Sequence, residues 1–96
     1  MDFKQAQEMM KLQQQAQKIQ EELSNTHIEA EVDGLVVTVD GQLELISIDF
    51  EDKAILKDEE KLKQALIQAY KKANKKAKEV AAEKLSGTLK WLGQFM

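Results

Sequence analysis

Asp33-Gly-Leu-Val-Val-Thr-Val-Asp-Gly41 is the stretch that decides the fold of this 96-residue chain. It is a β-branched strand with an Asp-Gly pair at each end. Asp-Gly is a strong signal for a two-residue hairpin, because both central positions of a type I′ turn need φ > 0. Leu35–Val39 is therefore predicted as the middle strand of a three-stranded antiparallel meander over residues 27–50. Its neighbours are expected at about residues 28–32 and 42–50.

A two-residue turn at the first Asp-Gly pair fixes the register of the first two strands. One set of apolar residues then shares a face, and a second tight turn adds three more from the third strand by period-two alternation. This face comprises Ile28, Ala30, Val32, Leu35, Val37, Val39, Ile46, Ile48 and Phe50. Because the face is continuous and apolar, we expect helices to cover it.

The opposite face of the meander is expected to carry Val36, Leu43 and Leu45 beside acidic residues. A half-apolar patch rimmed by acids is unusual in water. We therefore predict a homodimer in which a second copy covers this face, with these three residues in the interface.

A helix is predicted on each side of the meander, which makes the chain α+β with the order α-β-β-β-α. The first helix, residues 1–25, begins at the cap Asp2. Its apolar residues follow at alternating steps of three and four, a heptad seam longer than a three-stranded sheet covers. The seam comprises Met9, Leu12, Ala16, Ile19 and Leu23.

The second helix is predicted over residues 58–85, from the cap Asp58 to an interruption at Ser86-Gly87. Alanine recurs in it at every fourth residue from Ala65 to Ala81. Such a stripe lets another helix approach closely, so the far end is expected to pack against the first helix in an arm projecting beyond the sheet. The apolar segment 86–96 is expected to dock onto the body or a partner subunit.

The composition bounds the function. Ninety-six residues form one domain (1–96), and the chain has no cysteine. No apolar run fits a signal peptide or a membrane span, so a soluble intracellular protein without membrane association is expected. His27 has no nucleophile or base near it in sequence, and the acids at residues 49–52 lack the spacing of a cation site. We therefore predict no enzyme, no cofactor and no metal.

The charges are strongly segregated, although the net charge is only −3. Residues 61–90 hold nine lysines and two glutamates, whereas residues 21–60 hold thirteen acids and two lysines. On a solvated helix face, lysines usually alternate with acids at i,i+4. A cationic ridge on a projecting helix suits a polyphosphate backbone instead. The candidate DNA-binding residues are Lys4, Lys11, Lys18, Lys71, Lys72, Lys75, Lys76 and Lys78.

All fourteen basic residues are lysines. Arginine is the residue that makes bidentate contacts to guanine and enters narrow minor grooves, whereas lysine binds phosphate as a point charge. If the chain binds DNA, little direct reading of the bases is expected.

The chain also resembles a known family. Its order of elements resembles the YbaB/EbfC family of bacterial nucleoid-associated proteins over about residues 3–87. The matching motifs are Gly34-Leu-Val-Val-Thr-Val-Asp-Gly41, Ile46-Ser-Ile-Asp49, Asp58-Glu-Glu-Lys-Leu62 and Ala69-Tyr70 with the Lys/Ala/Asn run after it. The resemblance implies a cytoplasmic, nucleoid-located homodimer. It also implies sheets that associate and tweezer-like helical arms that bind double-stranded DNA with weak sequence preference.

Two hypotheses follow, from different classes of protein. The first is a nucleoid-associated homodimer that binds DNA nonspecifically through its lysine-bearing arms. The second is a non-enzymatic adaptor dimer that binds another protein through its helices and its C-terminal segment. Reversing the charge of the arm lysines distinguishes the two.

Overall fold

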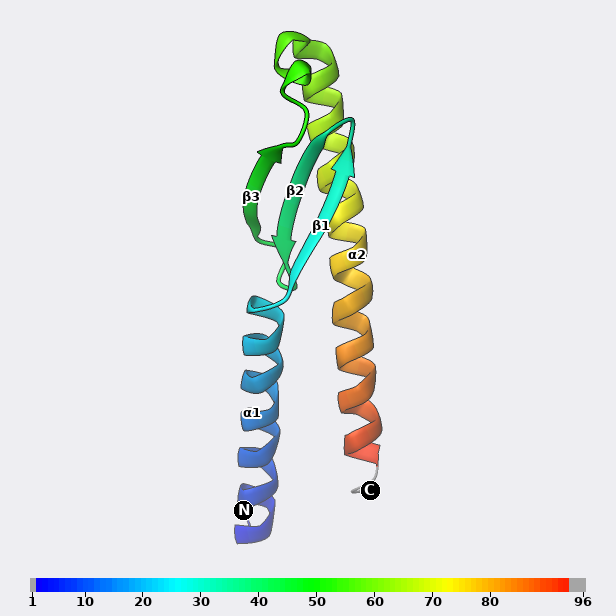
Figure 1. Cartoon of the computed structure of the whole chain (residues 1–96). Helices are drawn as coiled ribbons and strands as arrows, with labels where there is room; N and C mark the ends of the chain where they lie inside the picture. The colour runs from blue at the N-terminus through cyan, green and yellow to red at the C-terminus, as the bar shows by residue number, and fades with distance from the viewer. Residues whose placement is uncertain (1, 94–96) are drawn as a thin grey trace.

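The computed structural model describes residues 2–93, with side chains described for residues 2–87. The elements are α1 (Phe3–Ser24), β1 (His27–Val32), β2 (Leu35–Asp40), β3 (Leu45–Phe50), the 3-10 helix η1 (Lys53–Lys57) and α2 (Glu59–Gly93). Figure 1 shows α1 and the second half of α2 projecting from the same end of the sheet. The molecule measures 65 × 18 × 17 Å. The predicted α-β-β-β-α order is confirmed.

The first hairpin follows the sequence prediction residue by residue. Asp33 has φ 54° and Gly34 has φ 83°, as both central positions of a type I′ turn require. The register pairs Val32 with Leu35, and the pairing continues without a shift to the other end of both strands. A two-residue turn leaves no freedom to slip, so the predicted β1–β2 register is confirmed.

The second hairpin has a longer loop than the two-residue turn predicted at Asp40-Gly41. The Asp40 carboxylate is buried and accepts hydrogen bonds from the N–H groups of Gln42 (2.8 Å) and Glu44 (3.0 Å). Leu43 takes φ 70°, the left-handed region that a tight Asp-Gly turn would have given to glycine. The predicted turn was wrong because the aspartate side chain organises a wider loop around itself.

This loop changes the register of β3. Ser47 pairs with Thr38 and Leu45 pairs with Val39, so Ile46 is the extra residue of a β-bulge. Ile48 and Phe50 remain opposite Val37 and Leu35, as alternation predicts. Ile46 is half exposed, so its expected place under a helix was wrong.

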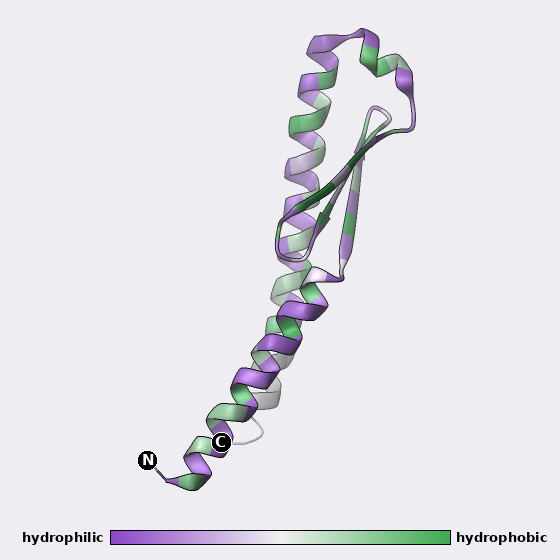
Figure 2. Ribbon diagram, turned by 90° about the vertical axis from the view of Figure 1, so that its left-hand side faces the viewer, coloured by the Kyte–Doolittle hydropathy of each residue, from purple (hydrophilic) through white to green (hydrophobic). Residues whose placement is uncertain are grey.

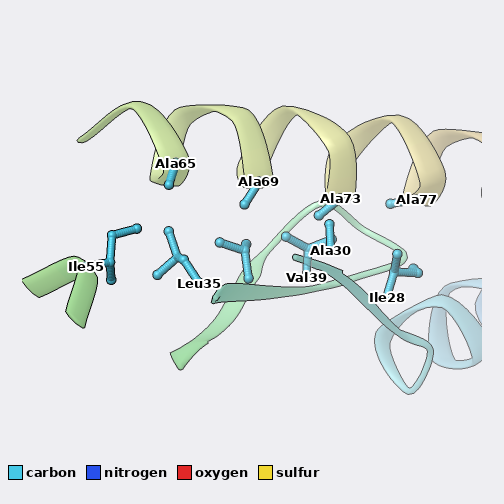
Figure 3. Close-up of a cluster of buried hydrophobic side chains, with 10 residues drawn as sticks. Ile28, Ala30, Leu35, Val39, Ile55, Ala65, Ala69, Ala73 and Ala77 are labelled. Atoms are coloured by element: carbon cyan, nitrogen blue, oxygen red, sulfur yellow. The ribbon is translucent and has the colours of Figure 1, made fainter. Parts of the chain in front are cut away.

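The core lies between α2 and the helix-facing side of the sheet (Figure 3). It combines strand residues with the alanine stripe of α2. The buried members are Ile28, Ala30, Leu35, Val37, Val39, Ile55, Ala65, Ala69, Ala73 and Ala77. The alanines therefore let the helix approach the sheet. The sequence predicted that the alanine stripe contacts another helix. This was wrong for Ala65, Ala69, Ala73 and Ala77, because these four residues pack over the sheet instead.

Helix α1 begins at the Asp2 cap, whose carboxylate accepts the Lys4 N–H at 3.3 Å. No residue of α1 is buried. Its C-terminal end is held to the sheet loop by the Gly41 N–H, which donates to the Leu23 carbonyl at 2.8 Å. Figure 2 shows α1 leaving the sheet as a projecting arm of mixed hydropathy.

Helix α2 continues through Ser86-Gly87 to Gly93, so the predicted interruption was wrong. A single glycine costs a helix only about 0.5–1 kcal/mol relative to alanine, and the helix-forming residues around it offset that cost. The predicted docking of segment 86–96 falls largely on side chains outside the described residues.

Candidate nucleic-acid interface

The lysines of α2 lie outside the alanine stripe. Because the stripe occupies every fourth position, the lysines between its members are left on the remaining three sides of the helix. All five are exposed, whereas Ala73 and Ala77 beside them are fully buried. These five are Lys71, Lys72, Lys75, Lys76 and Lys78. The sheet therefore fixes the helix with its cationic sides in water.

Two lysines of α2 reach other parts of the chain. The Lys76 ammonium donates to the main-chain carbonyl of Glu29 in β1 at 3.5 Å. The Lys84 ammonium lies 3.5 Å from the Glu22 carboxylate of α1 and so joins the two arms near the sheet. Among the described residues, no hydrogen bond or ion pair engages the ammonium groups of Lys71, Lys72, Lys75 and Lys78. These four are thus available to a polyanion.

The second cationic group is on α1. Lys4, Lys11 and Lys18 are exposed and repeat every seven residues, which places them within about 40° of one another around the helix. Exposed glutamines adjoin them, such as Gln7 and Gln14. Amide groups donate hydrogen bonds to phosphate oxygens. The α1 ridge is therefore less charged than α2 but has the chemistry of a backbone contact.

One group of acidic residues lies at the end of the molecule opposite the projecting arms. They belong to the β1–β2 turn and to the segment joining β3 to α2, at the top of Figure 1. Several have local structural tasks: the Asp52 carboxylate accepts the Ala54 N–H at 3.0 Å, and the Asp58 carboxylate accepts the Lys61 N–H at 3.1 Å. This end carries more acids than lysines, whereas the five lysines at residues 71–78 lie on the part of α2 that covers the sheet.

The three residues expected in a dimer interface differ in how far they are exposed in a single chain. Val36 is only 8% exposed in a single chain. Leu43 packs against the core from the β2–β3 loop. Leu45 alone is substantially exposed, at 49%. Other exposed apolar residues, which the sequence did not place in an interface, lie on β3 and on α2, at Ile46, Ile48, Ile67 and Tyr70.

His27 is exposed at the start of β1. Within residues 2–93, no group of three or more His, Asp or Glu side chains could hold a metal ion. No helix in that range is long and apolar enough to cross a membrane.

The fold and the exposed lysines define a small α+β protein with two projecting helical arms and a cluster of exposed lysines on the part of α2 that covers the sheet. The chain belongs to the YbaB/EbfC DNA-binding family, which it matches over residues 2–92. It is therefore a member of a family of nucleoid-associated DNA-binding proteins.

A solved structure supports the same fold. The chain is similar to the crystal structure of uncharacterized protein HP0035 from Helicobacter pylori, with a TM-score of 0.78 and 21% sequence identity. The match covers 93% of this chain and 98% of that one. No curated protein matches the chain.

Proposed function

We propose that this chain is a nucleoid-associated protein of the cytoplasm that binds double-stranded DNA as a homodimer. Its arms α1 and α2 contact the phosphate backbone, and it reads little of the base sequence. The observation that carries the proposal is the row of exposed lysines on α2, whose ammonium groups at Lys71, Lys72, Lys75 and Lys78 have no partner among the described residues.

The chemistry of the arms supports backbone contact. Neutralising phosphates with lysine releases condensed counterions, and this term supplies nearly all of nonspecific DNA binding. The acidic end of the molecule repels DNA, which favours an approach from the arms. Nonspecific affinities of this kind are about 10⁻⁴ to 10⁻⁶ M at physiological salt, and we expect the chain to fall in that range.

The absence of arginine supports low specificity. Bidentate arginine–guanine contacts are the commonest way to read the major groove. This chain has lysine at every basic position, so its cations hold the duplex without distinguishing base pairs.

The test compares two charge reversals of equal size. Lys72→Glu with Lys75→Glu changes the outer side of α2, whereas Lys53→Glu with Lys57→Glu changes exposed lysines of η1 at the acidic end. In mobility-shift titrations at several salt concentrations, the α2 variant should bind every duplex more weakly and with a flatter salt dependence. The η1 variant should change much less.

Equal effects of the two variants would show that only net charge matters and would remove the arms from the proposal. Unchanged DNA binding in the α2 variant would favour the adaptor hypothesis. That alternative has its own support, because α1 presents Phe3, Met9, Met10 and Leu12 to solvent. Circular dichroism on each variant confirms that the helices are retained.

A further inference from the structure

One face of the sheet has no helix over it in the described part of the chain. Helix α2 packs against β1 and β2 from a single side (Figure 2). Because side chains alternate along a strand, the residues between the buried core residues point to the other side. The strand pairing aligns them in two rows, Glu29–Thr38–Ser47 and Glu31–Val36–Asp49. We call these six residues the outer face.

The outer face carries negative charge without a balancing cation. Glu29, Glu31 and Asp49 are exposed, and residues 19–52 contain no lysine or arginine. Lys76 reaches only the main-chain carbonyl of Glu29, at 3.5 Å. Among the described residues, no ion pair engages the three carboxylates. The outer face therefore attracts a cationic partner.

The middle strand presents a shielded floor between these carboxylates. Val36 is 8% exposed and Thr38 is 6% exposed, although no helix lies over them. Within the described residues, no hydrogen bond engages the Thr38 hydroxyl. A shielded hydroxyl without a partner carries a free-energy cost that a donor from a ligand removes. Thr38 thus points to a ligand that crosses the centre of the outer face.

The spacing of the carboxylates determines which cation fits. Glu29 and Glu31 are two residues apart on one strand, about 6.8 Å, and Asp49 lies two strands from Glu31, about 10 Å. These distances are too long for the ligands of one metal ion, and the described part of the chain holds no group of three or more acids that could bind one. Alternate residues of an extended peptide have the same spacing of about 6.8 Å. The outer face therefore matches several cations on one extended segment.

Three kinds of occupant can be compared by charge. The carboxylates repel DNA. A second copy related by two-fold symmetry would bring its own outer face against this one, so that carboxylates would oppose carboxylates. Each chain also carries a net charge of −3, which opposes association through an acidic face. A basic protein segment meets neither objection.

The lysines proposed to bind DNA lie on the other side of the molecule. At about 100° per residue, Lys71 and Lys75 are each about 160° from Ala73 around α2. Ala73 is fully buried against the sheet, so these two lysines point away from it. A chain that binds DNA through α2 therefore leaves the outer face open to another protein.

We propose that the outer face binds a basic segment of another protein, an extended run in which lysine or arginine alternates with small residues. Its cations pair with Glu29, Glu31 and Asp49, and one of its hydrogen-bond donors binds the Thr38 hydroxyl. Segments rich in lysine and arginine occur as the arms of nucleic-acid-binding proteins. This inference goes beyond the proposed function, because it concerns a protein partner on the side away from the duplex.

The test measures binding of a labelled peptide of alternating lysine and threonine to the full chain at low salt, by fluorescence anisotropy. Glu29→Gln with Glu31→Gln should raise the dissociation constant about 3- to 30-fold, as expected for the loss of two exposed ion pairs. Glu8→Gln with Glu83→Gln is the matched control, because it removes the same charge from exposed positions on the helices. The control should change the constant by less than about twofold.

A third variant tests the position of the segment. Thr38→Val keeps the shape of the side chain and removes the hydroxyl, so it should raise the dissociation constant about 2- to 10-fold. An unchanged constant would overturn the proposal, because the segment would then not cross β2. Circular dichroism checks that each variant keeps its fold.

Two further outcomes would overturn the proposal. Equal losses in the two glutamate double variants would show that only net charge attracts the peptide. A peptide that converts dimers into single chains in sedimentation would show that a second copy occupies the outer face. The measurements contain no DNA, so their failure is separate from a failure of the proposed DNA binding.

Discussion

The Lys76 ammonium donates to the main-chain carbonyl of Glu29 at 3.5 Å, which brings a residue of the cationic helix onto the open edge of β1. Edge carbonyls are a template for unwanted strand pairing, and lysine is a residue that proteins place there. Neighbouring lysines of one helix therefore have different roles: Lys75 faces solvent, whereas Lys76 binds a main-chain carbonyl at the edge of the sheet.

The first prediction separates these two lysines. Lys75→Gln should lower DNA affinity and reduce the slope of log affinity against log salt by about 0.9 for each phosphate that the variant no longer neutralises. Lys76→Gln should reduce the slope by less, because its ammonium is engaged with Glu29. Salt titrations on one duplex measure both slopes, and a larger reduction for Lys76→Gln would contradict the assignment.

The second prediction compares two glycines. Gly34 has φ +83°, and a Cβ there would lie 2.6 Å from the Cβ of Asp52. Gly34→Ala should therefore lower the free energy of unfolding by more than about 1 kcal/mol. Gly87 has open space around it inside α2, so Gly87→Ala should raise helix stability by about 0.5–1 kcal/mol. Urea unfolding measures both changes. No effect at Gly87 would indicate that the helix ends before it.

The third prediction concerns the β2–β3 loop. Asp40→Ala removes the acceptor of two main-chain N–H groups and should cost about 1–3 kcal/mol of unfolding free energy. Asp40→Asn should cost less, because its amide oxygen still accepts. Glu44→Ala, a change of an exposed side chain in the same loop, should stay within about 0.5 kcal/mol of the parent. Equal losses of stability at Asp40 and Glu44 would contradict the capping role.

These loops show how far the sequence determines the fold. The β1–β2 register could be predicted because a type I′ turn admits one pairing. The same dipeptide at Asp40-Gly41 gave a wrong prediction, because the buried carboxylate competes with the tight turn and Leu43 accepts a left-handed conformation. Local sequence does not reveal which of the two geometries a buried aspartate stabilises.

The exposed surfaces were harder to predict than the register. Alternation assigns residues to faces, but it does not say how far across the sheet a helix extends. Helix α2 covers β1 and β2, which leaves Ile48 partly exposed on the face predicted to be covered. The exposure of the α2 lysines was easier to predict, because any helix that buries the Ala65–Ala77 stripe turns Lys71, Lys75 and Lys78 outward.

The last prediction concerns DNA sequence. Each base pair read directly contributes about 1–3 kcal/mol of discrimination, equivalent to about 5–150-fold in affinity. The arm cations are all lysine, so unrelated duplexes of equal length should bind with dissociation constants within about fivefold of one another. Duplexes with a stiff A-tract or a flexible TA step are compared separately, because their shape alters backbone spacing and groove width without direct base contacts. Competition titrations at fixed salt provide the comparison. Discrimination above about tenfold between duplexes of similar shape would mean that the arms read bases, and the exposed glutamines of α1 would then be the side chains to substitute first.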